Sequence, residues 1–228
     1  DVELLRKKKN LVEGKVTAVK TPSPHRVEPF CPHFGVCGGC KWQHMNYDAQ
    51  LHFKQKYVDN VLTRIGRVDT SSMEPILGSE ETAYYRNKLE YTFSNKRWLT
   101  NKDEEVDGRD MNALGFHVPG RFDKILDIDH CFLQADPSND IRNSIREFAS
   151  INQISFYELR AHEVALRNVI IRTASTGEVM VIVVFAYPTK VQIDQLMEFI
   201  SIKFPTLASL LYTVNQKGND TIFDQEIM

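Results

Sequence analysis

The sequence predicts an α+β fold with mixed and antiparallel sheets and flanking helices. Segments with the two-residue alternation of strands and segments with the period of amphipathic helices follow one another in mixed order. Residues 86–98 show the first pattern, because Leu89, Tyr91 and Phe93 alternate with polar residues. Residues 191–202 show the second pattern. With 228 residues and 42% hydrophobic content, the chain is long enough to bury a core.

The first third of the chain predicts a strand pair, a linker and a helix. Residues 2–5 and 11–19 have strand patterns, and we expect the basic run at 6–10 to form the turn between them. Pro22 and Pro24 make the following segment a stiff linker. Residues 47–65 carry apolar side chains at helical spacing, and the glycine at position 66 is placed to end that helix.

The rest of the chain predicts further strands and helices. Residues 101–112 are polar and acidic, which predicts a loop between the strand at 86–98 and a partner strand at 114–118. Residues 125–128 then lead the chain to Cys131. The remaining predicted elements are a helix at 137–150, strands at 163–173 and 179–186 joined by a hairpin turn, a helix at 191–202 and a strand at 210–214.

The charge balance is close to neutral, with a net charge of -2 and a pI near 6.4. RNA-binding domains often carry a basic excess, so any nucleic-acid contact is expected to come from local patches. No apolar run is long enough to span a membrane, and no targeting segment is visible. We therefore expect a cytoplasmic protein without a membrane partner. We also expect a monomer.

Three of the four cysteines lie close together in the sequence. Cys31, Cys37 and Cys40 form a C-x5-C-x2-C run, and Cys131 lies far downstream. Three interpretations of these cysteines are possible: buried unreacted thiols, a disulfide pair or a metal site. The glycines at positions 35, 38 and 39 favour the metal site, because several thiolates that converge on one ion or cluster need a tight loop. The sequence therefore predicts that all four cysteines are metal ligands.

The spacing also bears on which metal is bound. Zinc sites usually combine two close cysteine pairs, whereas plant-type ferredoxins combine a close trio with one remote cysteine. This spacing favours a [4Fe-4S] cluster over zinc. We interpret His33, His44 and His130 as ordinary polar side chains, because four thiolates already complete the ligand shell. No cysteine is then left for nucleophilic catalysis, so we assign no catalytic residue to this chain.

The cysteine run continues as Gly38-Gly39-Cys40-Lys41-Trp42-Gln43-His44 and then as YDAQLHFKQK at 47–56. This stretch resembles the RNA (uracil-5-)-methyltransferase family, in the iron–sulfur-containing branch that methylates 23S rRNA. Further matches are YYRNKLEY at 84–91, LGFH at 114–117 and the segment that leads into Cys131. The resemblance covers most of the chain. The tRNA branch of the family generally lacks the four cysteines, which favours the ribosomal branch.

The resemblance implies an enzyme of three parts. They are a small N-terminal β-barrel (the TRAM domain), a central α+β domain with a [4Fe-4S] cluster, and a Rossmann-like domain that binds S-adenosylmethionine. On this pattern residues 1–24 are the end of the barrel and a linker, and residues 25–228 are the central domain. No glycine-rich loop follows a strand, and no Asp-Pro-Pro-Arg motif is present. We therefore expect the methyltransferase domain after residue 228, S-adenosylmethionine bound outside this chain, and no catalysis by the chain alone.

RNA recognition typically combines cations that bind phosphate with aromatic rings that stack on unpaired bases. We expect Lys41 and Trp42, beside the cysteines, and Arg86 and Lys88, at a strand start, to contact RNA. Trp42 has an alternative role as a core aromatic packed on the cluster. We expect Tyr85 to lie in the core.

These features predict an RNA-binding, [4Fe-4S]-carrying fragment of an S-adenosylmethionine-dependent rRNA uracil-5-methyltransferase. RNA is the expected partner, with rRNA favoured and tRNA as the alternative. Two other functions stay open, which are a stand-alone iron–sulfur electron carrier and a zinc-stabilised nucleic-acid adaptor. The single metal site and the large α+β remainder argue against the electron carrier.

Overall fold

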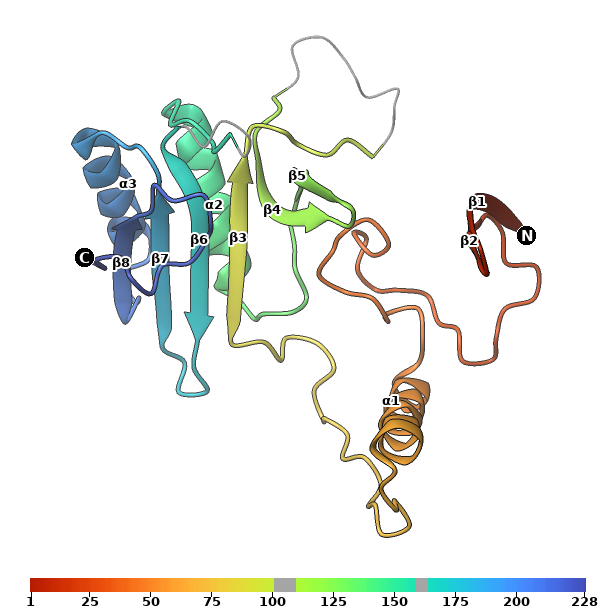
Figure 1. Ribbon diagram of the computed structural model, residues 1–228. Coiled ribbons are helices and arrows are strands. Elements are labelled where there is room, and N and C mark those ends of the chain that lie inside the picture. The colour runs from red at the N-terminus through yellow and green to blue at the C-terminus, as the bar shows by residue number, and fades with distance from the viewer. Residues whose placement is uncertain (101–109, 159–163) are drawn as a thin grey trace. The chain divides into compact units, whose positions relative to one another are not determined.

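The structure is a computed structural model that describes residues 1–100, 110–158 and 164–228. The chain divides into two compact units (Figure 1). The first contains Asp1–Phe30 and Trp42–Gly78, and the second contains Cys31–Lys41 and Ser79–Met228. All four cysteines therefore belong to the second unit. Most of the predicted acidic loop, at 101–109, lies outside the described residues, as does the first predicted residue of the strand at 163–173.

The first unit contains an antiparallel hairpin and one long helix. Strand β1 (Val2–Lys8) pairs with β2 (Leu11–Val16), and both are exposed along their whole length. The predicted turn at 6–10 is therefore partly wrong: the pairing of Lys8 with Leu11 leaves two residues for the turn, which is the usual length of a tight hairpin loop. The assignment of residues 1–24 to a barrel remnant stays a prediction.

Helix α1 (Tyr47–Val61) begins where the sequence predicts. The side chain of Asn46 caps it by accepting a hydrogen bond from the backbone N–H of Ala49 at 2.9 Å. A short π-helix, η1 (Leu62–Gly66), follows α1 directly. The left-handed residue that ends this segment is Arg67, with φ of 53°, and not the glycine that the sequence pattern suggested.

The second unit is built on one six-stranded sheet in the order β5-β4-β3-β6-β7-β8 (Figure 1). All neighbouring strands are antiparallel except β7 and β8, which are parallel. The predicted α+β class with a mixed sheet is confirmed. The strands are β3 (Lys88–Ser94), β4 (Ala113–Val118), β5 (Arg121–Asp127), β6 (Leu166–Thr173), β7 (Val179–Phe185) and β8 (Ser209–Val214).

Helices α2 (Ser138–Ile151) and α3 (Lys190–Lys203) pack on the same face of this sheet (Figure 1). The main core is formed by fully buried side chains of the sheet and of both helices, among them Tyr91, Phe93, Ile141, Ile145, Leu196 and Ile200. A smaller apolar cluster lies on the opposite sheet face, around Ile170, Ile182 and Val184. The odd-numbered residues of β3 thus face the helices, and Lys88 and Glu90 face the other way.

Candidate functional site

The loop at residues 31–41 brings three cysteines toward the fourth. Cys131 is 7% exposed and belongs to the main core, and Cys37 and Cys40 pack against the same core from the loop. Burial is the main cause that raises the pKa of Cys37 to about 11, and the thiols of Cys40, Cys131 and Cys31 each raise it further. The four thiols therefore lie close enough to interact electrostatically.

Short backbone hydrogen bonds and two glycines shape this loop. The N–H of Cys37 donates to the carbonyl oxygen of His33 at 2.9 Å, and Gly35 adopts the left-handed region with φ of 88°. The N–H of Gly38 donates to the carbonyl oxygen of His117, in β4, at 3.2 Å. A Cβ at Gly38 would lie 2.6 Å from that oxygen, so only glycine lets the loop lie against the end of β4.

Backbone N–H groups point at two of the sulfur atoms. The N–H of Gly39 donates to Sγ of Cys37 at 3.3 Å, and the N–H of Leu133 hydrogen-bonds to the thiol of Cys131 and lowers its pKa. Burial is the larger effect at Cys131, so its pKa is still raised above the ordinary value. One buried and three partly buried thiols become thiolates together only if positive charge is close to them.

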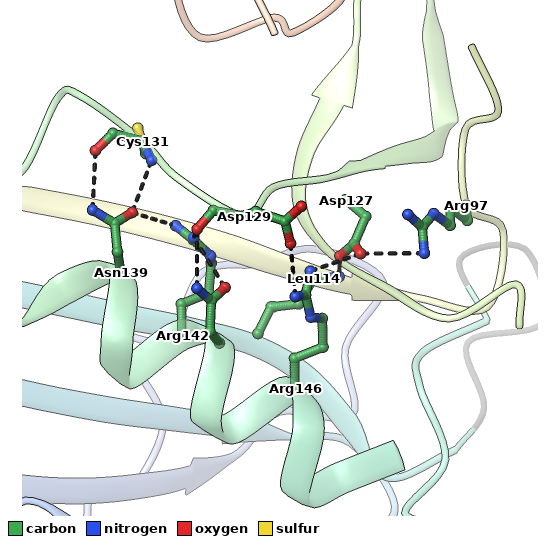
Figure 2. A network of polar contacts seen from close by, with 9 residues as sticks. Arg97, Leu114, Asp127, Asp129, Cys131, Asn139, Arg142 and Arg146 are labelled. Carbon is green, nitrogen blue, oxygen red and sulfur yellow. Dashed lines mark hydrogen bonds and ion pairs between the residues drawn. The ribbon is translucent and has the colours of Figure 1, made fainter. Parts of the chain in front are cut away.

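Helix α2 holds the segment that carries Cys131 (Figure 2). The side-chain oxygen of Asn139 accepts a hydrogen bond from the N–H of Cys131 at 2.8 Å, and its amide group donates back to the Cys131 carbonyl oxygen at 3.3 Å. The guanidinium of Arg142 donates to Asn139 Oδ1 at 3.0 Å and to the carbonyl oxygen of Asp129 at 2.6 Å. The backbone of residues 129–131 is therefore fixed from one face of the helix.

Arg142 is a buried cation whose acceptors are uncharged. Its side chain is fully buried, and its guanidinium carbon lies 5.0 Å from the centre of the Tyr91 ring. Among the described residues, its hydrogen bonds go to two side-chain amide oxygens and one backbone carbonyl, and its Nε has no partner. The positive charge of Arg142 lowers the pKa of Cys131. Within the described part of the chain, Arg142 is therefore a buried positive charge beside Cys131 that donates hydrogen bonds to no carboxylate, although it also acts on the charge of Asp129.

A second arginine of α2, Arg146, lies one turn after Arg142 and contacts the segment at residues 127–129 (Figure 2). Arg146 donates to Asp127 Oδ2 at 2.7 Å and to Asp129 Oδ1 at 2.9 Å, and Arg97 lies 3.3 Å from the same Asp127 oxygen. The other oxygen of Asp127 accepts the backbone N–H of Leu114 at 2.9 Å. The hydrogen bond from Arg146 lowers the pKa of Asp129. The ion pairs tie the end of β5 to α2, and the hydrogen bond from Leu114 ties it to β4.

Four cysteine thiols are a donor set that both zinc ions and iron–sulfur clusters take. All four cysteines lie in the described part of the chain, and all are thiols rather than disulfides. Within that part of the chain, no three His, Cys, Asp or Glu side chains stand close enough to share a single metal ion. A tetrahedral ion with bonds of about 2.3 Å needs its sulfurs within about 4 Å of one another. A four-iron cluster binds one thiolate on each iron, so its ligands stand further apart.

The structure places the four predicted RNA-contacting residues in both units. Trp42 belongs to the first unit, where it is 40% exposed and has Lys54 Nζ 5.6 Å from its ring centre. Lys41, Arg86 and Lys88 belong to the second unit and are exposed. Lys88 forms an ion pair with Glu90 at 3.2 Å. The alternative role for Trp42 as a core aromatic does not agree with its exposure.

The prediction that Tyr85 lies in the core is wrong. Tyr85 is 57% exposed, because β3 begins only at Lys88 and its in–out alternation does not extend back to position 85. The structure also adds a cation that the sequence analysis missed. Arg172 of β6 lies directly opposite Lys88 in the sheet, and both are exposed. Strand register places these like charges side by side, where they repel each other unless an anion lies between them.

Comparisons with known proteins agree with the resemblance at the level of RNA methyltransferases. No family model matches the chain. The chain is 50% identical along its whole length to an uncharacterized RNA methyltransferase of Bacteroides thetaiotaomicron, of which it covers 51%. It is 48% identical to an uncharacterized RNA methyltransferase of Porphyromonas gingivalis, of which it covers 50%. The chain thus spans about half the length of the curated relatives it matches.

A solved structure is similar to the whole chain. The crystal structure of Pyrococcus abyssi tRNA (uracil-54, C5)-methyltransferase in complex with S-adenosyl-L-homocysteine matches with a TM-score of 0.63 and 26% identity. The match covers 99% of this chain and 46% of that chain. None of the described helices is both long and apolar enough to cross a membrane.

Proposed function

We propose that the chain is the RNA-binding, [4Fe-4S]-carrying part of an S-adenosylmethionine-dependent RNA uracil-5-methyltransferase that acts on 23S rRNA. The observation that carries the proposal is the gathering of Cys31, Cys37, Cys40 and Cys131 in one compact unit of a chain similar throughout to RNA methyltransferases. A tRNA substrate is the second candidate, because the similar solved structure is that of a tRNA methyltransferase. A cytoplasmic monomer remains the prediction from the sequence.

Three features of the second unit support a cluster at the four thiols. Cys131 is buried and the other three cysteines are partly buried, two of the thiols receive backbone hydrogen bonds, and the buried cation of Arg142 acts on Cys131. Hydrogen bonds to sulfur and restricted solvent access are among the means by which proteins stabilise iron–sulfur clusters. A bound cluster would join the loop at 31–41 to the segment at 129–131, which are about 90 residues apart in the sequence. Its role in this proposal is to stabilise and position these segments.

The proposal assigns the chemistry of methylation to residues outside this chain. Uracil C5 is a poor nucleophile, and a cysteine thiolate that adds to C6 activates it, after which a base removes the C5 proton. The proposal uses all four cysteines of this chain as ligands. We therefore propose that the nucleophile, the base and the S-adenosylmethionine site belong to another part of the enzyme.

RNA binding is assigned to the cations near the start of β3. Arg86, Lys88 and Arg172 are exposed, and the register of β3 and β6 places the last two opposite each other. Lys41 at the end of the cysteine loop is a fourth cation of the same unit. Because the net charge of the chain is -2, these local cations must supply the attraction for phosphate.

The double variant Arg86→Glu/Lys88→Glu is expected to bind a 23S rRNA hairpin with unpaired uridines more weakly than the parent chain. Each lost phosphate contact also lowers the slope of log affinity against log salt by about 0.7–0.9. Fluorescence anisotropy at several salt concentrations measures both effects. The matched control is Lys190→Glu/Lys203→Glu, which makes the same change of charge at the two ends of α3 and should bind as the parent does. Equal affinity of parent and Arg86/Lys88 variant at low salt would contradict the assignment of this surface.

A further inference from the structure

Three aromatic rings gather beside the cysteine site. The rings of His130 and Phe132, on either side of Cys131 in the sequence, lie 4.4 Å apart. The ring of Tyr84 lies 5.9 Å from Phe132 and 6.3 Å from His130, and its hydroxyl shares a hydrogen bond of 3.1 Å with His130 Nε2. We call Tyr84, His130 and Phe132 the aromatic platform. Cys131 between them is buried, whereas Tyr84 is 43% exposed.

Backbone hydrogen bonds hold the platform in place. The backbone of Tyr84 has a conformation that tyrosine rarely adopts. Tyr84 has φ of 55°, in the left-handed region. Its N–H donates to the carbonyl oxygen of Phe132 at 2.7 Å, and the N–H of Arg86 donates to that of Leu133 at 2.8 Å. The segments at 84–86 and 132–134 therefore run side by side. Residues held in such conformations cluster at functional sites, because the surrounding structure must overcome the strain.

Three exposed cations follow the platform along the chain or the sheet, and the acidic Asp129 precedes His130. Arg86 follows Tyr84 by two residues, Lys88 begins β3, and Arg172 lies opposite Lys88 near the end of the antiparallel β6. Tyr84 itself is not needed to fill the core, since the main core is formed by other side chains. Exposed aromatic rings with cations close by are the combination that binds single-stranded nucleic acid, in which bases stack and phosphates pair with the cations.

We propose that the exposed ring of Tyr84, held edge-on by His130 and tilted against Phe132, stacks on one unpaired RNA base, while Arg86, Lys88 and Arg172 bind the phosphates next to that base. This inference rests on the proposed RNA-binding function and adds a base-binding site to it. It also gives the cysteine site a positioning role. A cluster bound to Cys131 would fix residues 130–132, and this segment carries the rings of His130 and Phe132.

The test uses the whole chain and two fluorescent RNA hairpins with the same stem. One hairpin has a loop of unpaired uridines, and the other has the same loop without bases. Tyr84→Ala is expected to weaken binding of the first hairpin by about 5- to 150-fold, which is the range for loss of one base-stacking side chain. It should leave binding of the abasic hairpin unchanged. Tyr84→Phe, which keeps the ring and loses the hydrogen bond to His130, should bind nearly as the parent does.

Two further variants separate stacking from misfolding. His130→Ala should weaken binding of the uridine hairpin in the same selective way, and Tyr57→Ala, an exposed tyrosine of α1, should have no effect. Equal binding of the uridine hairpin by parent and Tyr84→Ala would overturn the platform and leave the proposed RNA-binding function intact. Equal losses on both hairpins would also overturn it, since stacking requires a base. No binding by the parent would overturn both proposals.

Discussion

The Cys131→Ser variant is expected to lose its iron and to unfold at a lower temperature than the iron-loaded parent. Serine removes the one ligand outside the 31–40 loop, so the cluster would no longer join the loop to the segment held by α2. Loss of a structural metal site is among the largest effects of a single substitution, and we expect about 4 kcal/mol. For a domain of this size, that corresponds to a fall in Tm of about 8–16 °C.

The matched control for Cys131→Ser is the parent protein from which iron has been removed. Serine is close to cysteine in size, so the variant should unfold at nearly the temperature of the iron-free parent. Differential scanning calorimetry under nitrogen, with iron measured on the same samples, gives both numbers. Full iron content together with the Tm of the iron-loaded parent would show that Cys131 is not a ligand.

Arg142→Met is expected to destabilise the iron-loaded protein and to leave the iron-free protein unchanged or more stable. Methionine fills much of the same space without the charge. In the iron-free protein, Arg142 is a fully buried cation with uncharged acceptors, which costs free energy. In the loaded protein, four thiolates give the cluster a net negative charge, and removal of the cation then costs about 3 kcal/mol. Thermal unfolding of both forms measures the two effects.

Arg142→Lys supplies the control for Arg142→Met. It retains the positive charge but loses the planar fork that contacts Asn139 and the Asp129 carbonyl together. We expect it to fall between parent and Arg142→Met in the iron-loaded form. If Arg142→Met lowered the Tm of both forms equally, Arg142 would be a purely structural residue with no electrostatic relation to the thiols.

The sheet and its helices could be predicted because burial imposes a periodic pattern. Leu89, Tyr91 and Phe93 alternate in the sequence and are buried on the helix-facing side of β3 in the structure. Ile141 and Ile145 are spaced four residues apart in the predicted helix at 137–150, and both are fully buried in α2. The ends of elements were less predictable, because they depend on strand pairing, as in the hairpin of β1 and β2.

The surroundings of the candidate site could not be predicted in the same way. Arginine is rarely buried, so nothing in the sequence distinguished Arg142 from an exposed residue of its helix. The spacing of Asn139, Arg142 and Arg146 at three and four residues does place them on one helix face, and this signal was available. The pairing of Lys88 with Arg172 depends on the register of two strands about 80 residues apart, which the sequence pattern does not determine.

The most direct test of the proposed iron–sulfur site is the iron and acid-labile sulfide content of protein purified without oxygen. We expect about four iron atoms and four sulfide ions per chain, with broad absorption in the visible range. Substitution of any one of the four cysteines should lower the iron and sulfide content. One zinc ion per chain with no iron, under the same conditions, would contradict it.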